Sequence, residues 1–448
     1  MIKKLLFKLS QTKFFETILR QYWLYSLKRK KHLFIHAEKK PRLFWGPVPL
    51  INNKYWSNSL KEIGYVSNTI MHDYYATIHK KEDFDIYFTD IIKQYKSAIF
   101  PNVIAKLYHK LFLFEYLLFN YDIFTIPFTG LLYGGTPLEK FELDTLRMLG
   151  KKIVVIPYGG DAYMYSKIKS TSLQQALLFS YPEAGKIEAG IEHNVKFWQK
   201  NADAIVVDFM VDGQTRWDVL PCNILVIDHE LWQLKKTYSD CDGINGVVNI
   251  VHSPNHRGFK GTEFVIEAVR QLKEEGLKIN LILLEKVQND EVRRVFREDA
   301  DILVEQLILG YALNAIEGMA SGLPVLSNLS NEEYIRIFRR YSYLNECPII
   351  TSTPENVKEN LRVLVRNPDL RKELGLASRK YTEKYHSNPT AQFMFENIYD
   401  KVWYNKDVDL LKLFHPLNPN SFNNKSPLIE HPLVENQIPS ELLKTLNN

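Results

Sequence analysis

The sequence predicts an α/β protein of two domains, each built on a doubly wound parallel sheet. The chain has 448 residues, which is too long for one ordinary hydrophobic core. Its hydrophobic content of 45% and charged content of 24% are ordinary for a folded protein. Short apolar runs alternate with helical segments in two successive series, and this alternation is typical of parallel sheets covered by helices.

The first series follows Pro41 and forms an N-terminal domain over residues 41–230. A strand at 42–45 leads through the turn Gly46-Pro47-Val48-Pro49 into a helix at 55–63, which ends at Gly64. Four more strands are expected in the apolar runs 84–88, 123–127, 153–157 and 204–207.

The second series forms a C-terminal domain over residues 246–386, after a linker at 231–245 that is rich in Lys, Asp, Ser and Gly. Its strands are expected at 247–252, 279–284, 302–304, 324–326 and 348–350, with a helical region at 354–386. One more amphipathic helix lies at 390–404. Residues 406–448 are rich in Pro, Asn and Ser, and we expect them to form a loosely ordered tail.

The positive charge of the chain is concentrated at its N-terminus. The net charge is +5, but residues 1–42 carry twelve Lys or Arg against two Glu, or +10, so the remainder carries −5. Apolar residues at near-helical spacing precede Lys28-Arg29-Lys30-Lys31, which makes residues 1–40 a basic amphipathic arm. Residues 1–35 can lie in an anionic membrane surface, or they can be a helix packed on the protein body with a solvated charge run.

Several classes of protein are not expected. Cys222, Cys241 and Cys347 lie far apart, which argues against a disulfide framework or a cysteine zinc site and suits a reducing compartment. No apolar run reaches the ~18–20 residues of a membrane-spanning helix, and the interrupted apolar stretches at the start do not indicate a signal peptide. No nucleic-acid-binding module accompanies the basic arm, so nucleic acid is not an expected partner.

The segment 251–262 carries a candidate anion site. Its sequence, Val-His-Ser-Pro-Asn-His-Arg-Gly-Phe-Lys-Gly-Thr, spans the end of a strand and the start of a helix. Open α/β sheets bind ligands at such places, where free N–H groups and the helix dipole favour an anion. Arg257 and Lys260 add two positive charges, which suit a diphosphate that gains charge as a bond breaks. Taken alone, both would be ordinary surface cations.

The segment 305–327 carries a second candidate site. A loop ends at Gly310-Tyr311, and a short helix through 315–320 stops at Gly322 before a strand. Glu317 lies on this otherwise small and apolar helix, where a carboxylate needs a partner or a ligand. A carboxylate can accept hydrogen bonds from both hydroxyls of a ribose, and Gly310 lets the backbone approach a phosphate closely.

The order of these residues resembles a known family. His252-Ser-Pro-Asn-(x)4-Lys260-Gly-Thr is followed by Glu317-Gly-Met-Ala-Ser-Gly-Leu-Pro-Val. This pattern is similar to that of the GT-B glycosyltransferases of retaining family 4 (glycosyl transferases group 1), especially bacterial members that make surface polysaccharides. The resemblance covers residues 42–405 and is sharpest at 247–327.

The resemblance implies two Rossmann-like domains that face each other across a cleft, with the segment 387–405 crossing back between them. It implies that the donor is bound by five residues, Arg257, Lys260, Gly310, Tyr311 and Glu317. The two cations would bind the diphosphate, and Glu317 would bind the ribose.

The chain departs from the family pattern at two places. The family's Arg usually lies five residues before the Lys, where this chain has Asn255, so Arg257 is a substitute by proximity. The family also carries two glutamates separated by seven residues, of which the second matches Glu317 and the first would fall at Leu309. Glu305, or the backbone of Gly310 and Tyr311, would then have to supply the contact with the donor sugar.

The N-terminal half has one matching phrase, Ile156-Pro-Tyr-Gly-Gly-Asp-Ala-Tyr163, which resembles the family's His-Gly-Ser-Asp segment facing the sugar. Tyr158 stands at the His position, and Asp161 would orient hydroxyls as a catalytic candidate beside Arg257 and Lys260. A helix N-cap is the equal alternative for Asp161. Gly46, Tyr158 and Gly160 would lie on the acceptor side, although Gly46 can equally belong to a plain turn.

The resemblance therefore implies a hexosyl-type glycosyltransferase of polysaccharide or glycan biosynthesis. It would move a sugar from a nucleotide-sugar, with UDP as the default, to a saccharide or lipid-linked acceptor with retention. No cofactor is expected, because the nucleotide-sugar is a substrate. Asp299-Ala-Asp301 mimics the metal motif of GT-A transferases, but its twin at Asp203 indicates a strand entry, so no metal is expected. The expected location is cytoplasmic, at the inner membrane face if the arm binds lipid.

Three alternatives stay open. A sugar-nucleotide epimerase of the same fold would release free sugar without an acceptor, and a phosphorylase would need inorganic phosphate. A catalytically silent paralogue would act as a scaffold or subunit, and the residues at Leu309 and Tyr158 motivate this reading.

Overall fold

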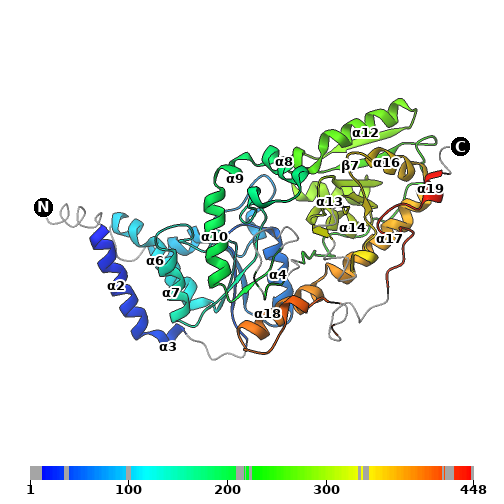
Figure 1. Cartoon of the computed structure of the whole chain (residues 1–448). Coiled ribbons are helices and arrows are strands. Elements are labelled where there is room, and N and C mark those ends of the chain that lie inside the picture. Colours follow the sequence, from blue (N-terminus) through cyan, green and yellow to red (C-terminus); the bar gives the residue numbers. More distant parts are fainter. Residues whose placement is uncertain are drawn as a thin grey trace.

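The computed structural model (Figure 1) describes residues 13–34, 40–96, 102–207, 216, 218–220, 224–330, 334–335, 343–415, 418 and 428–444. Within these residues it contains a six-stranded and a five-stranded sheet, one in each half of the chain. The two-domain α/β architecture predicted from the sequence is confirmed. No helix of the described part is long and apolar enough to span a bilayer.

The N-terminal sheet has the order β3-β2-β1-β4-β5-β6, with parallel pairing throughout. Its order reverses between β1 and β4, as in doubly wound sheets. The strands are β1 Leu43–Trp45, β2 Ser67–Met71, β3 Ile86–Tyr87, β4 Ile123–Ile126, β5 Lys152–Val155 and β6 Ala204–Ile205. The helices of this half are α2 Lys13–Arg29, α3 Lys31–Phe34, α4 Ile51–Glu62, α5 Phe88–Lys96, α6 Asn102–Asn120, α7 Glu139–Met148, α8 Thr171–Ser180, α9 Pro182–Lys186 and α10 Glu188–Asn201, with 3-10 turns at Lys81–Asp83 and Tyr165–Lys167.

The C-terminal sheet has the order β11-β10-β9-β7-β8, again all parallel, and it reverses between β7 and β9. Its strands are β7 Val248–His252, β8 Ile279–Leu283, β9 Ile302–Gln306, β10 Val325–Ser327 and β11 Ile350–Thr351. The helices are α11 Arg257–Lys260, α12 Thr262–Glu274, α13 Asn289–Glu298, α14 Leu313–Ala320, α16 Val357–Arg366, α17 Pro368–Tyr385, α18 Asn388–Val402 and α19 Ser440–Lys444, with 3-10 turns at Tyr343–Glu346 and Leu410–Lys412. The region predicted to be helical over 354–386 forms two helices, α16 and α17, which separate at Pro368 because proline cannot donate an N–H and begins α17.

The last long helix, α18, returns to the N-terminal half and lies against α4 (Figure 1). Ser59 of α4 donates to the Asn388 carbonyl at 3.0 Å. Phe395 packs edge-on against Trp45 of β1, with ring centroids 4.8 Å apart. One hydrophobic cluster therefore contains residues of both sheets and of α18.

The described part of the arm packs on the N-terminal domain. Trp23 of α2 donates to Glu115 at 2.9 Å and stacks on Phe114 of α6, and Leu27 is buried. Figure 1 shows α2 beside α6 and α7, at the end of the molecule away from the C-terminal sheet. One face of α2 is therefore packed on the N-terminal domain, as in the second of the two alternatives that the sequence left open. The calls on residues 1–12 and 35–39 lie outside the described residues.

The segment 428–444 differs from the predicted loosely ordered tail. Leu433 and Ile438 are buried in the core of the C-terminal domain, and the buried side chain of Asn436 donates to the Ile349 carbonyl at 3.2 Å. A few apolar residues hold this segment on the domain through their contacts with the core. The overall composition of the segment, which is mostly polar, did not predict this packing.

Candidate functional site

The candidate donor site lies where the order of the C-terminal sheet reverses. Lys260 ends the short helix α11 beyond β7, and Glu305 and Gln306 end the neighbouring strand β9. Parallel α/β sheets bind ligands at the carboxyl ends of strands at such a reversal. The buried ring of His252 joins these elements, since it contacts the Val304 carbonyl at 2.7 Å and the Thr262 hydroxyl at 2.9 Å.

His252 is the last residue of β7 and is fully buried. Burial lowers its pKa to about 4, with the positive charges of Lys260 and Arg257 acting in the same direction. A neutral ring suits its position, because it must accept on one nitrogen and donate on the other. His252 is therefore a structural residue that connects β7 to β9 and to the first residue of α12.

Lys260 is held by an acidic and an amide side chain. Its ammonium forms a buried ion pair with Glu305 and donates to Gln306 Oε1 at 2.8 Å. The Ser327 hydroxyl lies 3.0 Å from the second oxygen of Glu305 and 2.5 Å from the Gly310 carbonyl, and its single proton is donated to one acceptor at a time. The Glu305 side chain is fully buried in its pair with Lys260, so the expectation that Glu305 contacts the donor sugar finds no support in this geometry. Glu305 instead fixes the position of Lys260.

Glu317 lies on α14, and its carboxyl group is buried. Among the described residues, no hydrogen bond or ion pair reaches this carboxyl. Burial raises its pKa to about 8, while the positive charges of Arg293 and Lys260 oppose the rise and Glu305 adds to it. A buried carboxyl that lacks a protein partner fits a ligand with two hydroxyl donors.

Arg257 and Lys260 lie on the same short helix but have different partners. The side chain of Arg257 is 41% exposed, and it pairs with Glu263 at 2.8 Å and with Glu285 at 2.9 Å. Lys260, in contrast, forms the buried pair with Glu305. The two predicted diphosphate cations are therefore held by different carboxylates, one at the surface and one in the interior.

The loop before α14 is held by residues at the end of β10. The Gly310 N–H donates to the Asn328 carbonyl at 2.6 Å, and the Gly310 carbonyl lies 2.5 Å from the Ser327 hydroxyl. The Tyr311 hydroxyl contacts His386 Nε2 at 3.2 Å, at the junction of α17 and α18. Leu309 is fully buried. The N–H of Gly310 is thus already used within the protein, which weakens its predicted role as a phosphate or sugar ligand.

No protein-family model and no curated sequence matches the chain. Among solved structures, the chain is similar to a point mutant of S. aureus TarM crystallised with fondaparinux, α-GlcNAc-glycerol and UDP, at 9% identity, with a TM-score of 0.54 over 81% of this chain and 100% of that one. It is less similar to an α-glucosyltransferase crystallised with UDP and a DNA 13-mer, with 12% identity, a TM-score of 0.46, and 80% and 100% coverage. S. aureus MnaA crystallised with UDP has 13% identity to the chain and a TM-score of 0.42, and the match covers 83% of this chain and 100% of that one.

The fold is GT-B. Two parallel-sheet α/β domains and the likeness to TarM together show it. At these identities the likeness extends to the fold alone.

On the N-terminal side of the GT-B fold, Asp161 organises a loop after β5. Its buried carboxylate accepts from the Phe128 N–H and the Tyr158 N–H, both at 2.9 Å. Burial raises its pKa to about 7, against the effect of these N–H groups. Asp161 is neither the cap of an observed helix nor open to a substrate hydroxyl. It joins the loops that follow β4 and β5.

Tyr158 and Gly160 lie on this loop, and both have room around them. The Tyr158 ring is 40% exposed, and a side chain at Gly160 would meet nothing. Gly46 follows β1, where its φ of 156° and the approach of the Ile70 carbonyl leave no space for a β-carbon. A glycine is needed here because the backbone of Gly46, after β1, lies directly against that of Ile70 in β2. The alternative that Gly46 belongs to a plain turn explains this requirement without a role in acceptor binding.

The two GT-B domains touch beside the donor loop. The Phe259 N–H donates to the Ser180 hydroxyl at 2.8 Å, and the rings of Tyr181 and His256 lie 4.1 Å apart. Gly258 lies against Phe179 of α8, where a β-carbon would overlap the ring. α8 therefore covers α11, the helix that carries Lys260.

Sequence reasoning missed Ser327, Gln306, Trp232 and Arg293. Ser327 and Gln306 lie within the predicted motif region but play supporting roles that no spacing indicated. Trp232 lies in the predicted linker and Arg293 lies on α13. Neither belongs to a motif, and only the fold brings the Arg293 guanidinium to 5.6 Å from the centroid of the Trp232 ring.

Proposed function

We propose that the protein is a glycosyltransferase whose C-terminal domain binds the nucleoside diphosphate of a sugar donor. The observation that carries the proposal is the pair Lys260 and Glu317, which come from α11 and α14 at the reversal point of the sheet. One is a cation fixed in place, and the other is a buried carboxyl without a protein partner among the described residues. UDP is the proposed nucleotide, and its presence in the TarM crystal supports that choice.

In this proposal Lys260 binds the diphosphate and compensates the negative charge that grows as the glycosidic bond to phosphate breaks. Glu317 accepts hydrogen bonds from the two ribose hydroxyls. The leaving phosphate oxygen takes the proton of the attacking acceptor hydroxyl, so that retention requires no base from the protein. Asp161 shapes the acceptor-side loop rather than touching the substrate, because its carboxyl group is buried and both of its oxygens accept from backbone N–H groups.

Arg257 has a smaller part in the proposal than Lys260. To bind a phosphate it would have to leave Glu263 and Glu285, with which it forms exposed ion pairs. Exposed pairs contribute only about 0–1 kcal/mol each, so this rearrangement is open to it. Hexosyl transfer without a metal ion and a saccharide or lipid-linked acceptor complete the proposal.

The test measures UDP binding and UDP-sugar hydrolysis over a panel of donors. Lys260→Ala alone is a poor variant, because it leaves Glu305 buried without a partner, at a cost of about 3–5 kcal/mol. Lys260→Met combined with Glu305→Gln removes both charges together and keeps the volume. We expect the double variant to fold and to lose UDP binding. If the wild type gains no thermal stability from UDP or any other nucleoside diphosphate, the proposal is wrong.

The same panel separates the alternatives. A transferase releases UDP faster when a saccharide acceptor is added, and activity that survives a chelator supports the metal-independent form. An epimerase releases free sugar at a rate that no acceptor changes. A catalytically silent paralogue would bind UDP but show no turnover. This alternative is motivated by Leu309, which stands where the family has an acidic residue.

We further propose that the arm binds an anionic membrane surface. The face of α2 opposite Trp23 exposes Tyr22 and Tyr25, with 70% and 58% of their surfaces in solvent. The exposed cationic run Lys28-Arg29-Lys30-Lys31 follows directly. Aromatic side chains beside a cluster of cations suit the headgroup region of anionic lipid, and anchoring by Trp23 would fix the N-terminal domain against it.

The membrane proposal is tested by co-sedimentation with phosphatidylcholine vesicles, with and without phosphatidylglycerol. Replacing residues 28–31 by glutamine should reduce binding to the anionic vesicles by on the order of a hundredfold or more, at about 1 kcal/mol for each cation. The matched control replaces four exposed lysines of the C-terminal half, Lys236, Lys273, Lys372 and Lys380. Equal loss in both variants, or tighter binding to nucleic acid than to vesicles, would reject the membrane role.

A further inference from the structure

Helix α14 carries a second polar side chain whose hydrogen bonding is incomplete. The Asn314 side-chain amide donates to the Ser253 carbonyl at 3.2 Å, and Ser253 lies in the loop that joins β7 to α11. The Asn314 Oδ1 atom is buried, and among the described residues no group donates to it. Because a buried acceptor without a donor destabilises the folded state, this oxygen is suited to a ligand that brings a hydroxyl or an N–H.

The contact with Ser253 fixes which way the Asn314 amide faces. If the amide were reversed, Oδ1 would lie against the Ser253 carbonyl oxygen, and two acceptors repel each other. The nitrogen therefore takes the side toward Ser253, and Oδ1 takes the opposite side. The side chain uses its donor to join α14 to the donor loop and keeps its acceptor for another group.

Asn314 lies at the end of the sheet where the donor site is proposed. It precedes Glu317 by three residues, so the two side chains share one face of α14, about one turn apart. Its partner Ser253 follows directly after β7, at the carboxyl edge where the order of the sheet reverses. Ligands of parallel α/β sheets bind at this edge. Both neighbours of Asn314 thus belong to the candidate donor site.

The other groups considered for the contact with the donor sugar are occupied or apolar. Leu309 is fully buried and has no polar atom in its side chain. The Glu305 side chain is fully buried in its ion pair, and the N–H of Gly310 is used within the protein. Asn314 offers an acceptor, on the same helix as Glu317, that none of these groups supplies.

The chemistry of a nucleotide-sugar decides which of its parts can pair with Oδ1. In the proposed function Glu317 binds the ribose and Lys260 binds the diphosphate. A diphosphate has no hydrogen to donate, so an amide oxygen cannot bind it. Asn314 lies one turn nearer the start of α14 than Glu317 and is bonded to the loop that leads to Lys260. It is therefore on the diphosphate side of the ribose, where the next donors along the ligand are the hydroxyls of the sugar.

We propose that Asn314 is a sugar-binding residue, whose Oδ1 accepts a hydrogen bond from one hydroxyl of the donor hexose. This inference rests on the proposed donor function and names a contact that the predicted donor residues do not include. The ligand class is a UDP-hexose with that hydroxyl free. UDP lacks the sugar, so the contact favours the intact donor over the UDP that remains after transfer.

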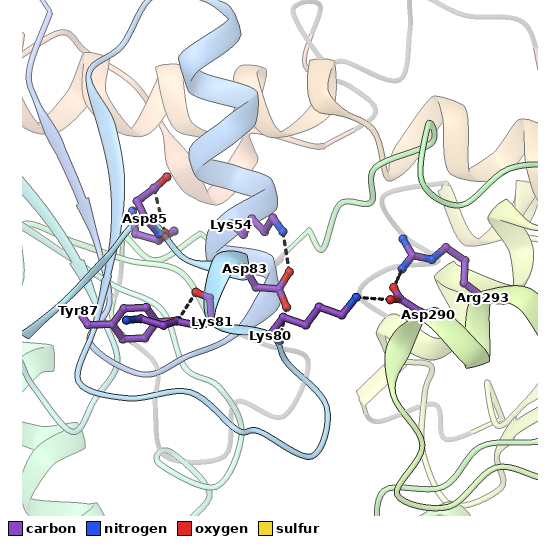
Figure 2. A network of polar contacts seen from close by, with 9 residues as sticks. Lys54, Lys80, Lys81, Asp83, Asp85, Tyr87, Asp290 and Arg293 are labelled. Carbon is purple, nitrogen blue, oxygen red and sulfur yellow. Dashed lines mark hydrogen bonds and ion pairs between the residues drawn. The ribbon is translucent and has the colours of Figure 1, made fainter. Parts of the chain in front are cut away.

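The contact between the two domains has to be separated from this effect, because it lies at the same edge of the sheet. Figure 2 shows Lys80, on the segment after β2, in an ion pair with Asp290 at the start of α13. Nearby, the Gln288 side-chain amide donates to the Ala76 carbonyl at 3.0 Å. Lys80 and Asp290 are about half exposed, with values of 51% and 55%, so their pair contributes little to stability. Lys80→Gln weakens this contact without touching α14.

The test measures dissociation constants by calorimetry for UDP and for UDP-glucose, UDP-galactose and UDP-N-acetylglucosamine. The wild type should bind at least one UDP-hexose more tightly than UDP. Asn314→Leu keeps the number of side-chain heavy atoms and removes the acceptor. It should weaken the binding of that UDP-hexose relative to UDP by on the order of tenfold, the worth of one hydrogen bond. Asn314→Ala should give the same change in ratio if the leucine variant folds poorly.

A series of deoxyfluoro analogues of the same UDP-hexose identifies the hydroxyl, because fluorine in place of a hydroxyl cannot donate a hydrogen bond. In the wild type, one position should cost on the order of tenfold in affinity. In Asn314→Leu, fluorine at that position should cause no further loss. Equal losses in the two proteins would show that the hydroxyl binds elsewhere and would overturn the proposal.

Two control variants should keep the ratio of UDP-hexose to UDP affinity at the wild-type value. Lys80→Gln tests the contact between the domains. Asn397→Leu removes a half-buried asparagine of α18 whose amide donates to the Phe393 carbonyl at 2.7 Å, which matches the bond that Asn314 makes. A change of ratio in Lys80→Gln as large as that in Asn314→Leu would assign the effect to domain closure and overturn the proposal.

The remaining outcomes separate this inference from the proposed function. Equal loss of affinity for UDP and the UDP-hexose in Asn314→Leu would overturn the sugar contact, because Asn314 would then act on the nucleotide or on the Ser253 loop, and donor binding would stand. An unchanged ratio would overturn it as well. A wild type that binds neither UDP nor any of the UDP-hexoses would overturn the proposed function, and this inference with it.

Discussion

Two buried carboxyl groups, Asp161 and Glu317, have opposite surroundings. Asp161 receives backbone N–H donors on both oxygens, whereas no described residue donates to Glu317. The first arrangement completes a loop within the protein. The second leaves hydrogen-bonding capacity that only water or a ligand can satisfy. This contrast is the reason that we place Glu317, and not Asp161, in contact with substrate.

The raised pKa of Glu317 predicts that ionisation of this buried carboxyl lowers the free energy of unfolding at alkaline pH. Its pKa is about 8 in the folded protein against the ordinary 4.5, so the folded state keeps a proton that the unfolded state has lost between these values. Wild-type stability should therefore fall as the pH rises from about 4.5 to 8, by on the order of 5 kcal/mol. Glu317→Gln removes this dependence.

The measurement is the melting temperature of the ligand-free protein at about pH 5 and about pH 9. The difference between Glu317→Gln and the wild type should grow with pH. Glu373→Gln, which changes an exposed glutamate of α17, provides the control and should give equal shifts at both pH values. A wild-type advantage that persists at alkaline pH would show that the carboxylate has a partner in the protein.

Which residues could be predicted depended on whether they lie in one short motif. Lys260 and Glu317 each stand in a segment whose turn, glycines and apolar helix face are visible in the sequence, and both lie at the predicted end of the sheet. Arg293 and Trp232 come from α13 and the linker, where nothing local distinguishes them. Arg257 was predicted from proximity in sequence, but two nearby glutamates turn its side chain outward.

At the scale of elements, apolar runs predicted most strands to within a few residues. β2, over Ser67–Met71, was missed because its first three residues are polar. The Ser67 hydroxyl accepts from the Trp45 indole at 2.8 Å, and Thr69 donates from its N–H to Asp85 at 2.8 Å. Buried polar residues are tolerated in a strand when they are hydrogen-bonded. The partners of Ser67 and Thr69 lie on other elements of the fold, so these hydrogen bonds could not be predicted from the local sequence.

Helix α14 must lie close to β9 if Glu317 is to approach Lys260. Gly318 makes this possible, because a β-carbon there would overlap the Leu303 side chain, which is fully buried. Gly318→Ala should therefore destabilise the protein by about 1–3 kcal/mol, although alanine favours helix formation. It should also weaken UDP binding, since Glu317 precedes the displaced residue.

A matched substitution separates steric overlap from helix propensity. Gly190 lies in α10 with no atom within reach of an added β-carbon, so Gly190→Ala should stabilise the protein by about 0.5–1 kcal/mol. Urea denaturation measures both effects. If both alanines stabilise the protein equally, the Leu303 side chain of β9 can move away from α14 without loss of stability. The close approach of α14 to β9 would then not be needed.

At the scale of the whole molecule, α18 joins the two GT-B domains through a shared core. Phe395 has no exposed surface, and its ring lies 4.8 Å from that of Trp45 and 5.6 Å from that of Trp56. Surface links such as Lys80 with Asp290 add little beside this contact. The domains should therefore unfold together in one cooperative transition.

Phe395→Ala should remove about 3–5 kcal/mol and separate the unfolding of the domains into two steps. Phe124→Ala deletes an equally buried ring in a cluster confined to the N-terminal half, and should lower the melting temperature while a single transition remains. Differential scanning calorimetry distinguishes these cases, because the ratio of calorimetric to van't Hoff enthalpy exceeds one when steps separate. A single two-state transition in Phe395→Ala would show that contacts such as α8 with α11 suffice to couple the domains, and that α18 only accompanies them.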